Sequence, residues 1–371
     1  MDLQESITNQ TDVSFMLAKH IFSKEVNGDT NLVLSPLSIQ IALGLIAAGS
    51  NGPTQDQLLC FLKSKSINEL SSLILSTPSL LMEAPMEHSF KHVVDNVYKA
   101  SSEYVDFQNK PAEVANQVNQ WAKMKTNDLI KEILPPDAVD DMTRLIFANA
   151  LYFKGEWNEK FYAFETKDHE FHLLNEGSVR APFMTSQKEQ YITAFDGFKM
   201  LRLPYKQGTD TCRFCMHFIL PDARDGLPAL LDKISSEPGF LNRHFPYEKV
   251  KARKFLIPKF KITFGFEATK VLWGLGLKSP FYPGGLSEMV DSHISKKLFV
   301  SDVYHKSFIE VNEEGTEAAA ITAVIVMLQS QCVSIEKEID FVADHPFLFL
   351  VRDESTGAIL FLGSVMNPLD G

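Results

Sequence analysis

The sequence predicts a single large α+β domain. Its first 142 residues are patterned mainly as helices, and most of the remaining residues are patterned as strands. No internal repeat, low-complexity tract or linker rich in Gly, Ser or Pro interrupts the 371 residues. Helices early, strands late and no boundary between them are typical of one α+β domain rather than of two or three smaller ones. We therefore expect residues 1–371 to form one domain.

Apolar residues at helical spacing predict the first helices. One follows Thr11 and ends at Asn27–Gly28, and the next begins at Pro36 behind Ser35, a preferred N-cap residue. The second helix is apolar on nearly every side, so it should be buried. Further helices are predicted, in order, over residues 54–62, 69–75, 90–98 and 114–134.

After residue 142 the period changes from helical to alternating. Residues 143–157 form a long strand pattern with Leu145, Phe147 and Leu151 on the same face as Asn149. A buried amide without partners costs about 1–3 kcal/mol, so we expect Asn149 to make specific hydrogen bonds. Further strands are predicted over residues 170–174, 198–205, 213–220, 255–266, 299–311, 347–351 and 359–365, and helices over residues 227–234 and 267–275.

The composition argues against several classes of partner. The chain has 47 acidic and 36 basic residues, a formal net charge of −11 and a pI near 5.4. Such a chain repels nucleic acid and anionic lipid surfaces unless basic residues cluster on one face. The densest basic run, residues 249–254, alternates as a strand would. We expect no nucleic-acid partner and no membrane partner.

Cellular location is predicted from three features of the sequence. No segment has the roughly 20 apolar residues needed to cross a bilayer, and residues 1–6 are acidic and polar rather than typical of a signal peptide. Four cysteines are too few for a disulfide scaffold and are expected to be reduced. We expect a cytoplasmic or nucleocytoplasmic protein, with extracellular release left open.

No pattern of residues predicts an enzyme. Cys212 and Cys215 form a C-x-x-C, but it begins a strand rather than a helix, and no second cysteine pair is available for zinc. Cys332 with His305 or His345 lacks a nucleophile turn, and no G-x-S-x-G is present. We expect no catalytic residue, no metal site and no cofactor.

The segment 313–328 differs from the rest of the chain. Gly315 provides a flexible joint, and the alternate residues after it are small or β-branched. The segment fits a helix capped by Thr316 and fits a strand equally well. Two viable conformations are what a conformational switch requires.

At these residues the chain resembles the serpin family. Residues 313–320 resemble the proximal hinge of that family, residues 149–155 with Trp157 resemble the third strand of its central sheet, and residues 344–349 and 357–363 resemble its C-terminal strands. Ser35–Pro36 with Ser38, and His305–Lys306, also match. The resemblance covers essentially the whole chain, and residues 341–347 look most like a plant serpin.

The resemblance implies a fold and a mechanism. The fold would have three β-sheets, about eight or nine helices and an exposed reactive-centre loop at about residues 315–335. The family acts by offering this loop to a protease, which cleaves it and is trapped as the hinge inserts into the central sheet. The hinge would comprise Glu314, Gly315, Thr316, Glu317, Ala318, Ala319, Ala320, Ile321 and Thr322. The polar network that opens the sheet would comprise Ser35, Ser38, Asn149, Trp157 and His305.

The spacing of the family places the scissile bond between Gln329 and Ser330, with Met327 and Leu328 in the preceding subsites. Gln329 argues against trypsin-like targets. Leu328 suits papain-like cysteine proteases, and a one-residue shift would offer Leu328 to chymotrypsin-like serine proteases. The resemblance thus implies a target protease as partner and a monomeric inhibitor of serine- or cysteine-type proteases.

One departure from the family opens an alternative function. Between Met82 and the helix at Phe90, the family places a long strand of the central sheet, and residues 83–89 contain no alternating run that could supply it. A missing strand should impair inhibition. The alternative is a non-inhibitory interaction or storage protein with a serpin fold.

Overall fold

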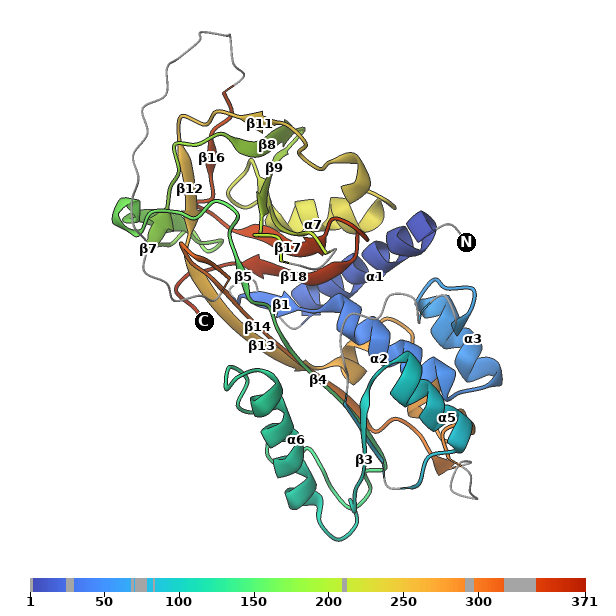
Figure 1. The fold of residues 1–371 in the computed structure, drawn as a ribbon. Coiled ribbons are helices and arrows are strands. Elements are labelled where there is room, and N and C mark those ends of the chain that lie inside the picture. Colours follow the sequence, from blue (N-terminus) through green and yellow to red (C-terminus); the bar gives the residue numbers. More distant parts are fainter. Residues whose placement is uncertain are drawn as a thin grey trace.

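Helices cover both faces of a long central sheet, and two further sheets pack at one end of it (Figure 1). The computed structural model describes residues 3–24, 30–67, 70, 79–82, 84–208, 212–290, 297–316 and 338–371. Within these residues there are seven α-helices, a π-helical segment and three short 3-10 helices. The α-helices are α1 (Leu3–Lys24), α2 (Pro36–Ala48), α3 (Gly52–Phe61), α5 (His88–His92), α6 (Pro111–Lys125), α7 (Leu227–Ser236) and α8 (Ala268–Gly274).

The central sheet carries the predicted hinge. Its strand order is β3-β2-β4-β14-β15-β5, and β13 also pairs with β14. The strands are β2 (Ser79–Met82), β3 (Ser101–Tyr104), β4 (Leu145–Tyr152), β5 (Gly155–Glu156), β13 (Phe260–Glu267), β14 (Asp302–Val311) and β15 (Gly315–Thr316). Strands β4 and β14 are parallel, whereas β13 and β15 run antiparallel to β14.

The other two sheets are antiparallel apart from one parallel pair. The second sheet has the order β1 (Leu32–Leu34), β18 (Ile359–Val365), β17 (Phe347–Asp353), β10 (Phe214–Pro221), β9 (Phe198–Pro204), β8 (Gln190–Phe195) and β11 (Lys249–Val250). The third has the order β16 (Phe341–Val342), β12 (Phe255–Pro258), β7 (Ser178–Met184) and β6 (Lys167–His172), with β12 and β16 parallel.

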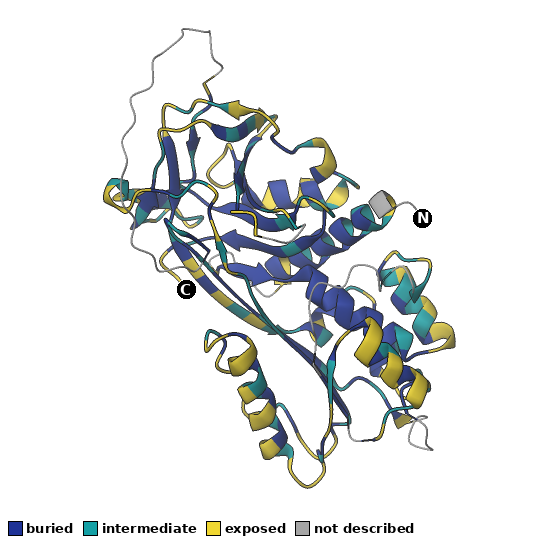
Figure 2. Cartoon of the chain, in the orientation of Figure 1, coloured by how far each residue is buried: buried dark blue, intermediate teal, exposed yellow. Residues whose placement is uncertain are grey.

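Helix α2 is buried on nearly all sides, as its uniformly apolar sequence predicts (Figure 2). Its N-cap is Ser35, whose hydroxyl accepts a hydrogen bond from the backbone N–H of Ser38, and Pro36 occupies the first helical position. Serine is favoured as the N-cap because its hydroxyl accepts a hydrogen bond from a free N–H of the first turn. Proline is favoured at the first helical position because it lacks the N–H that a helix start leaves unpaired. The cap fixes where the helix begins and thereby places Ser35 and Ser38 beneath the central sheet.

Alternating side chains of β4 pack on two different helices. Leu145 and Phe147 belong to the same apolar cluster as α2, whereas Ile146 and Ala148 pack with Val114, Val118 and Ala122 of α6. This is the period-2 alternation that the sequence predicts, and both faces are buried. The central sheet is therefore enclosed between α2 and α6.

Several predicted boundaries differ from the observed ones. Helix α1 begins at Leu3, eight residues before the predicted start, and the predicted stop at Asn27–Gly28 lies outside the described residues, as does most of the helix predicted over 69–75. The strand predicted over 255–266 is two strands, β12 and β13, which belong to different sheets and meet at Lys259. The helix predicted over 90–98 is α5 followed by a π-helical segment, Val93–Val97.

The predicted gap in the central sheet needs a correction. Residues 84–89 contain no strand beyond an isolated bridge between Met86 and Val290, as predicted. The sheet does not lack a strand at this position, however, because β2 lies just upstream and pairs antiparallel with β4 and parallel with β3. The strand is present but has only four residues. It shows no alternation of polar and apolar residues after Ser79, because Leu80, Leu81 and Met82 are all buried.

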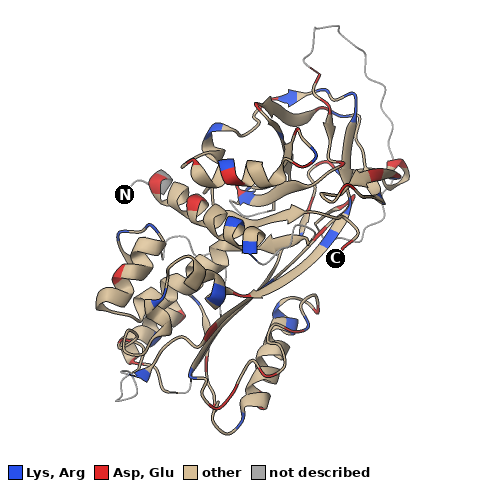
Figure 3. Cartoon of the chain, turned by 180° about the vertical axis from the view of Figure 1, so that it is seen from behind, with Lys and Arg blue, Asp and Glu red and all other residues tan. Residues whose placement is uncertain are grey.

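Charges of both signs are interspersed over the described part of the chain (Figure 3). In the basic run at 249–254, Lys249 forms an ion pair with Glu159 at 2.8 Å, and Arg253 lies 3.4 Å from both Glu338 and Asp340. Among the described residues, no helix is both long enough and apolar enough to span a bilayer.

Candidate functional site

In the central sheet, β4 and β14 pair directly along most of their length, and at one end another strand lies between β14 and β5. Strands β4 and β14 pair directly from Ile146–Asp302 to Tyr152–Phe308, seven residue pairs in all. Beyond Tyr152, the two-residue strand β15 lies between β14 and β5, with Thr316 opposite both Val311 and Gly155. We call this region, Gly155–Trp157 with Asn312–Thr316, the insertion end of the sheet. The predicted hinge therefore already contributes two residues to the sheet.

A tight turn from β14 into β15 depends on Gly315. The side-chain oxygen of Asn312 accepts hydrogen bonds from the N–H groups of Glu314 and Gly315, at 3.0 and 3.3 Å. Gly315 has a φ of +154°, and a Cβ there would lie 2.0 Å from the carbonyl oxygen of Gly155. No side chain fits at that distance, so only glycine allows the hinge to enter here.

Ion pairs hold both glutamates of this turn. Glu313 lies 2.8 Å from Lys259 and accepts a hydrogen bond of 2.7 Å from Thr166. Burial opposes ionisation of Glu313, but the hydrogen bonds from Lys259 and Thr166 outweigh it and lower the pKa of its carboxyl. Glu314 lies 2.5 Å from Lys160 and raises the pKa of that amine through their hydrogen bond. The turn is thus anchored to the body of the molecule.

Two aromatic side chains lie beside the hinge. Trp157 donates its indole N–H to the carbonyl of Asn312 at 2.8 Å, and its ring stacks on Tyr205 with a centroid distance of 4.5 Å. The Tyr205 hydroxyl lies 2.7 Å from the hydroxyl of Thr316. The sequence does not single out Tyr205, because this residue only ends a predicted strand and nothing near it in the chain reveals its partner.

A second polar cluster lies deeper in the sheet, around His305 of β14. Its Nε2 accepts a hydrogen bond of 3.0 Å from the N–H of Ser35 and lies 2.8 Å from the Ser307 hydroxyl. Its Nδ1 lies 3.5 Å from the hydroxyl of Ser38, which donates to the carbonyl of Ser35 at 2.9 Å. Asn149 is opposite His305 in the ladder and donates to the carbonyl of Ser38 at 3.3 Å. We call these five residues the His305 network.

The His305 network requires a neutral imidazole. Nε2 faces the fixed N–H donor of Ser35, so it must be unprotonated, and the single ring proton is on Nδ1, where it can be donated to Ser38. His305 is 1% exposed, and burial lowers its pKa to about 3. The network therefore links the start of α2, β4 and β14 without any charge.

The structure brings together four of the five predicted network residues. Ser35, Ser38, Asn149 and His305 form one cluster, and Ser307 is a further member that sequence analysis missed. Trp157 is at the insertion end instead, beside Asn312 and Tyr205. Of the hinge, the structure describes Glu314, Gly315 and Thr316, whereas residues 317–322 and the predicted scissile region 327–330 lie outside the described residues.

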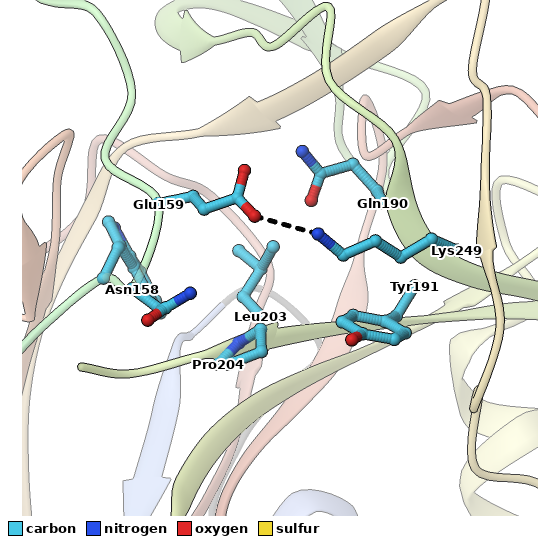
Figure 4. A pocket seen from close by; sticks show the side chains of 8 residues that line it. Asn158, Glu159, Gln190, Tyr191, Leu203, Pro204 and Lys249 are labelled. Carbon is cyan, nitrogen blue, oxygen red and sulfur yellow. Dashed lines mark hydrogen bonds and ion pairs between the residues drawn. The ribbon is translucent and has the colours of Figure 1, made fainter. Parts of the chain in front are cut away.

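The other sequence motifs do not assemble into a site within the described residues. Cys215 is buried in β10, and burial raises the pKa of its thiol to about 12, which disfavours the thiolate that a nucleophile requires. The described residues contain no group of three or more metal-ligating side chains. A pocket of about 70 Å³ beside Trp157 is lined by Glu159, Tyr191 and Lys249 among others, and is too small for a drug-sized ligand (Figure 4).

The fold and the insertion end together define a class of protein. It is an α+β protein whose central sheet begins to admit a short strand, Gly315–Thr316, from its own polypeptide. The family model for Serpin (serine protease inhibitor) matches residues 8–368, and the chain belongs to this family. Protease inhibition is the function of the family, and a target protease is its general partner.

Plant proteins are among its relatives. Serpin-ZX from Arabidopsis thaliana is 51% identical over 392 residues, with 100% of both chains covered. Serpin-ZXA from Oryza sativa subsp. japonica is 48% identical and covers 99% of this chain and 98% of its own. The predicted resemblance to plant serpins is therefore confirmed. The comparison with Serpin-ZX extends over 392 positions against 371 residues here, so this chain has no residue at 21 or more of them.

Solved structures confirm the serpin fold. Arabidopsis AtSerpin1 in its native stressed conformation matches with a TM-score of 0.90 at 49% identity, covering 100% of this chain and 99% of that one. Serpin48 of the insect Tenebrio molitor matches with a TM-score of 0.83 at 27% identity and 99% coverage of both chains.

Proposed function

We propose that this protein inhibits a protease by insertion of its cleaved loop between β4 and β14. The observation that supports this most directly is β15, which already occupies the space between β14 and β5. Insertion would lengthen β15 along β14 and would separate the seven residue pairs that join β14 to β4. It would replace one strand interface with two.

The register of β15 predicts where each hinge residue would lie. Val311 is opposite Thr316 in an antiparallel pair, so each later hinge residue meets an earlier residue of β14. Ala320 would lie opposite Ser307, and Thr322 opposite His305, on the face towards α2. Ile321 would lie opposite Lys306, on the other face. Small side chains would therefore meet the buried His305 network, and the two large side chains beyond Thr316, Glu317 and Ile321, would both point to the other face.

The energetic gain is sufficient to drive such a rearrangement. Each added ladder hydrogen bond contributes about 1 kcal/mol net, and burial of the alternate side chains adds to this. Over about ten residues the sum is comparable with the roughly 5–15 kcal/mol of a whole domain's stability. Serpin loop insertion is itself a standard example of strand addition, and a protease attached to the loop would be moved with it.

The target and the setting are part of the same proposal. Cleavage would fall between Gln329 and Ser330, with Leu328 favouring a papain-like cysteine protease, or a chymotrypsin-like serine protease if the cleaved bond is shifted by one residue. The protein would act as a monomer, because all strands of the reaction belong to one chain, and as an inhibitor rather than an enzyme. The chain has few cysteines, which we expect to be reduced thiols, and this supports a cytoplasmic or nucleocytoplasmic location.

A protease panel tests the proposal. The protein is mixed with papain, chymotrypsin and trypsin, and we expect an SDS-resistant band of summed mass with one of the first two and not with trypsin. The matched variants Ala320→Glu and Ile321→Glu place the same charge on opposite faces of the inserted strand. We expect Ala320→Glu to abolish the covalent band and Ile321→Glu to retain most of it. Equal behaviour of the two variants would contradict the proposed register.

The shortness of β2 supports a second candidate function. If β4 is not held firmly on its outer side, insertion fails and the protein is a non-inhibitory binding or storage protein with a serpin fold. Cleavage of the loop by every protease of the panel without a covalent band, and without a rise in unfolding temperature, would favour this second function.

A further inference from the structure

Among the described hinge residues, Thr316 is the one whose side chain is fully buried in the protein. Its hydroxyl lies 2.7 Å from the hydroxyl of Tyr205. Tyr205 is outside the central sheet, directly after β9, so this contact joins the hinge to a different part of the fold.

The ring of Tyr205 cannot easily move. Trp157 stacks on it with an interplanar angle of 15°, and Phe153 meets it edge-on at a centroid distance of 4.9 Å. Tyr205 also forms a backbone bridge with Trp157, and its N–H donates to the carbonyl of Phe214 at 3.0 Å. Burial raises the pKa of its hydroxyl, which therefore keeps its proton and can donate or accept.

Register decides whether the hinge can be accommodated. Successive side chains of a strand point to opposite faces, so a slip of one residue moves every side chain to the other face. Such a slip would turn Ile321 towards the His305 network and would place a residue with a Cβ against the carbonyl of Gly155, where only Gly315 fits. A device that fixes Thr316 would prevent this slip before the rest of the hinge arrives.

We propose that Tyr205 is the positioning residue that sets the register of the inserting hinge, through its hydrogen bond to Thr316. The proposal rests on the insertion mechanism proposed above and adds a residue outside both the hinge and the His305 network. Tyr205 touches neither the protease nor the scissile bond. Its effect is on how the acyl-enzyme partitions between trapping and release.

The test compares Tyr205→Phe with Tyr191→Phe. Tyr191 lines the neighbouring pocket (Figure 4), and among the described hinge residues, 314–316, none forms a hydrogen bond with its hydroxyl. From the loss of one buried hydrogen bond we expect the ratio of cleaved inhibitor to covalent complex to rise about three- to ten-fold in Tyr205→Phe. The rate of the initial cleavage should be unchanged, and Tyr191→Phe should match the wild type.

Variants of Thr316 complete the experiment. Thr316→Val should shift the ratio as Tyr205→Phe does, the double variant should be no worse than either single one, and Thr316→Ser should restore the wild-type ratio. Additive effects in the double variant, or a wild-type ratio in Tyr205→Phe, would overturn the proposal.

A readout without a target protease separates this proposal from the inhibitory function. Hydrogen exchange of the intact protein should be about three- to ten-fold faster at the amides of Gly315 and Thr316 in Tyr205→Phe, and unchanged in Tyr191→Phe. If the exchange difference is found but the wild type forms no covalent complex, the inhibitory function is refuted and the positioning role of Tyr205 is not. If the wild type forms the complex but exchange is unchanged in Tyr205→Phe, the positioning role is refuted and the inhibitory function is not.

Discussion

Strand β4 is bound very differently on its two sides. Towards β14 it makes seven residue pairs, and the His305 network lies beneath them. Towards β2 it makes four residue pairs, and the side chains that hold β2 there are apolar: Leu80, Leu81 and Met82 are at most 3% exposed.

This difference matters because insertion must separate β4 from β14 while β4 stays attached to β2. By the number of ladder pairs alone, the outer interface is the weaker one. The apolar burial of β2 therefore has to compensate for the pairs that β2 lacks. Three predictions test whether it does, in order of decreasing expected effect.

Leu80→Ala should have the largest effect. Leu80 is fully buried in the cluster that contains α2, and a buried Leu→Ala change typically costs about 2–5 kcal/mol because it leaves a cavity. Urea unfolding of the intact protein should show this loss, and the fraction of protease trapped should fall with it.

The control for Leu80→Ala is Tyr104→Ala in the neighbouring strand β3. Tyr104 is 70% exposed and pairs with Met82, so its loss should cost less than about 0.5 kcal/mol. A cost below 1 kcal/mol for Leu80→Ala would show that β2 contributes little to holding β4, and would favour the non-inhibitory function.

The second prediction concerns pH and the inner side of β4. The pKa of His305 is about 3 in the folded protein and about 6.5 when unfolded, so its contribution to stability is complete above pH 6.5 and is lost as pH falls towards 3. We expect the difference in unfolding free energy between the wild type and His305→Gln to shrink by about 1 kcal/mol per pH unit below 6.5.

The unfolding free energy of the wild type must be compared with that of His305→Gln, because another group titrates in the opposite sense. Burial, followed by the nearby Glu267, raises the pKa of Asp302 to about 7, so its contribution is lost as pH rises from its unfolded value towards 7. Asp302 is present in both proteins, so its contribution cancels from the difference in unfolding free energy. A difference that stays constant from pH 7 to pH 5 would show that His305 is not held neutral.

The smallest effect is expected for Asn149→Ala. Its amide makes one hydrogen bond of 3.3 Å to the carbonyl of Ser38, and such a bond contributes about 0.5–1 kcal/mol. Thermal unfolding measures the loss. A loss as large as that of Leu80→Ala would mean that the polar inner side of β4, and not the apolar outer side, determines its stability.

Local signals in the sequence predicted individual elements well. The cap at Ser35 with Pro36, the uniformly apolar α2 and the alternation of β4 depend on neighbours in the chain, so they can be read without a structure. The boundary between β12 and β13 could not be predicted, because the apolar pattern continues across Lys259 while the two strands join different sheets.

The candidate site was predicted in part, chiefly through the family resemblance. That resemblance identified Ser35, Ser38, Asn149 and His305 as a group, and the structure shows them in contact. It did not identify Ser307 or Tyr205, because a serine in a strand and a tyrosine at a strand end have no distinctive local pattern.

By itself, the sequence determined the α+β class and the buried helix α2, since these follow from periodicity and capping. Only the tertiary structure decided that β2 exists, that Trp157 belongs to the insertion end and that Tyr205 binds Thr316. The physical reason is that strand pairing and buried hydrogen bonds join residues far apart in the chain. Leu80 meets Phe147, and Tyr205 meets Thr316, only after the chain has folded.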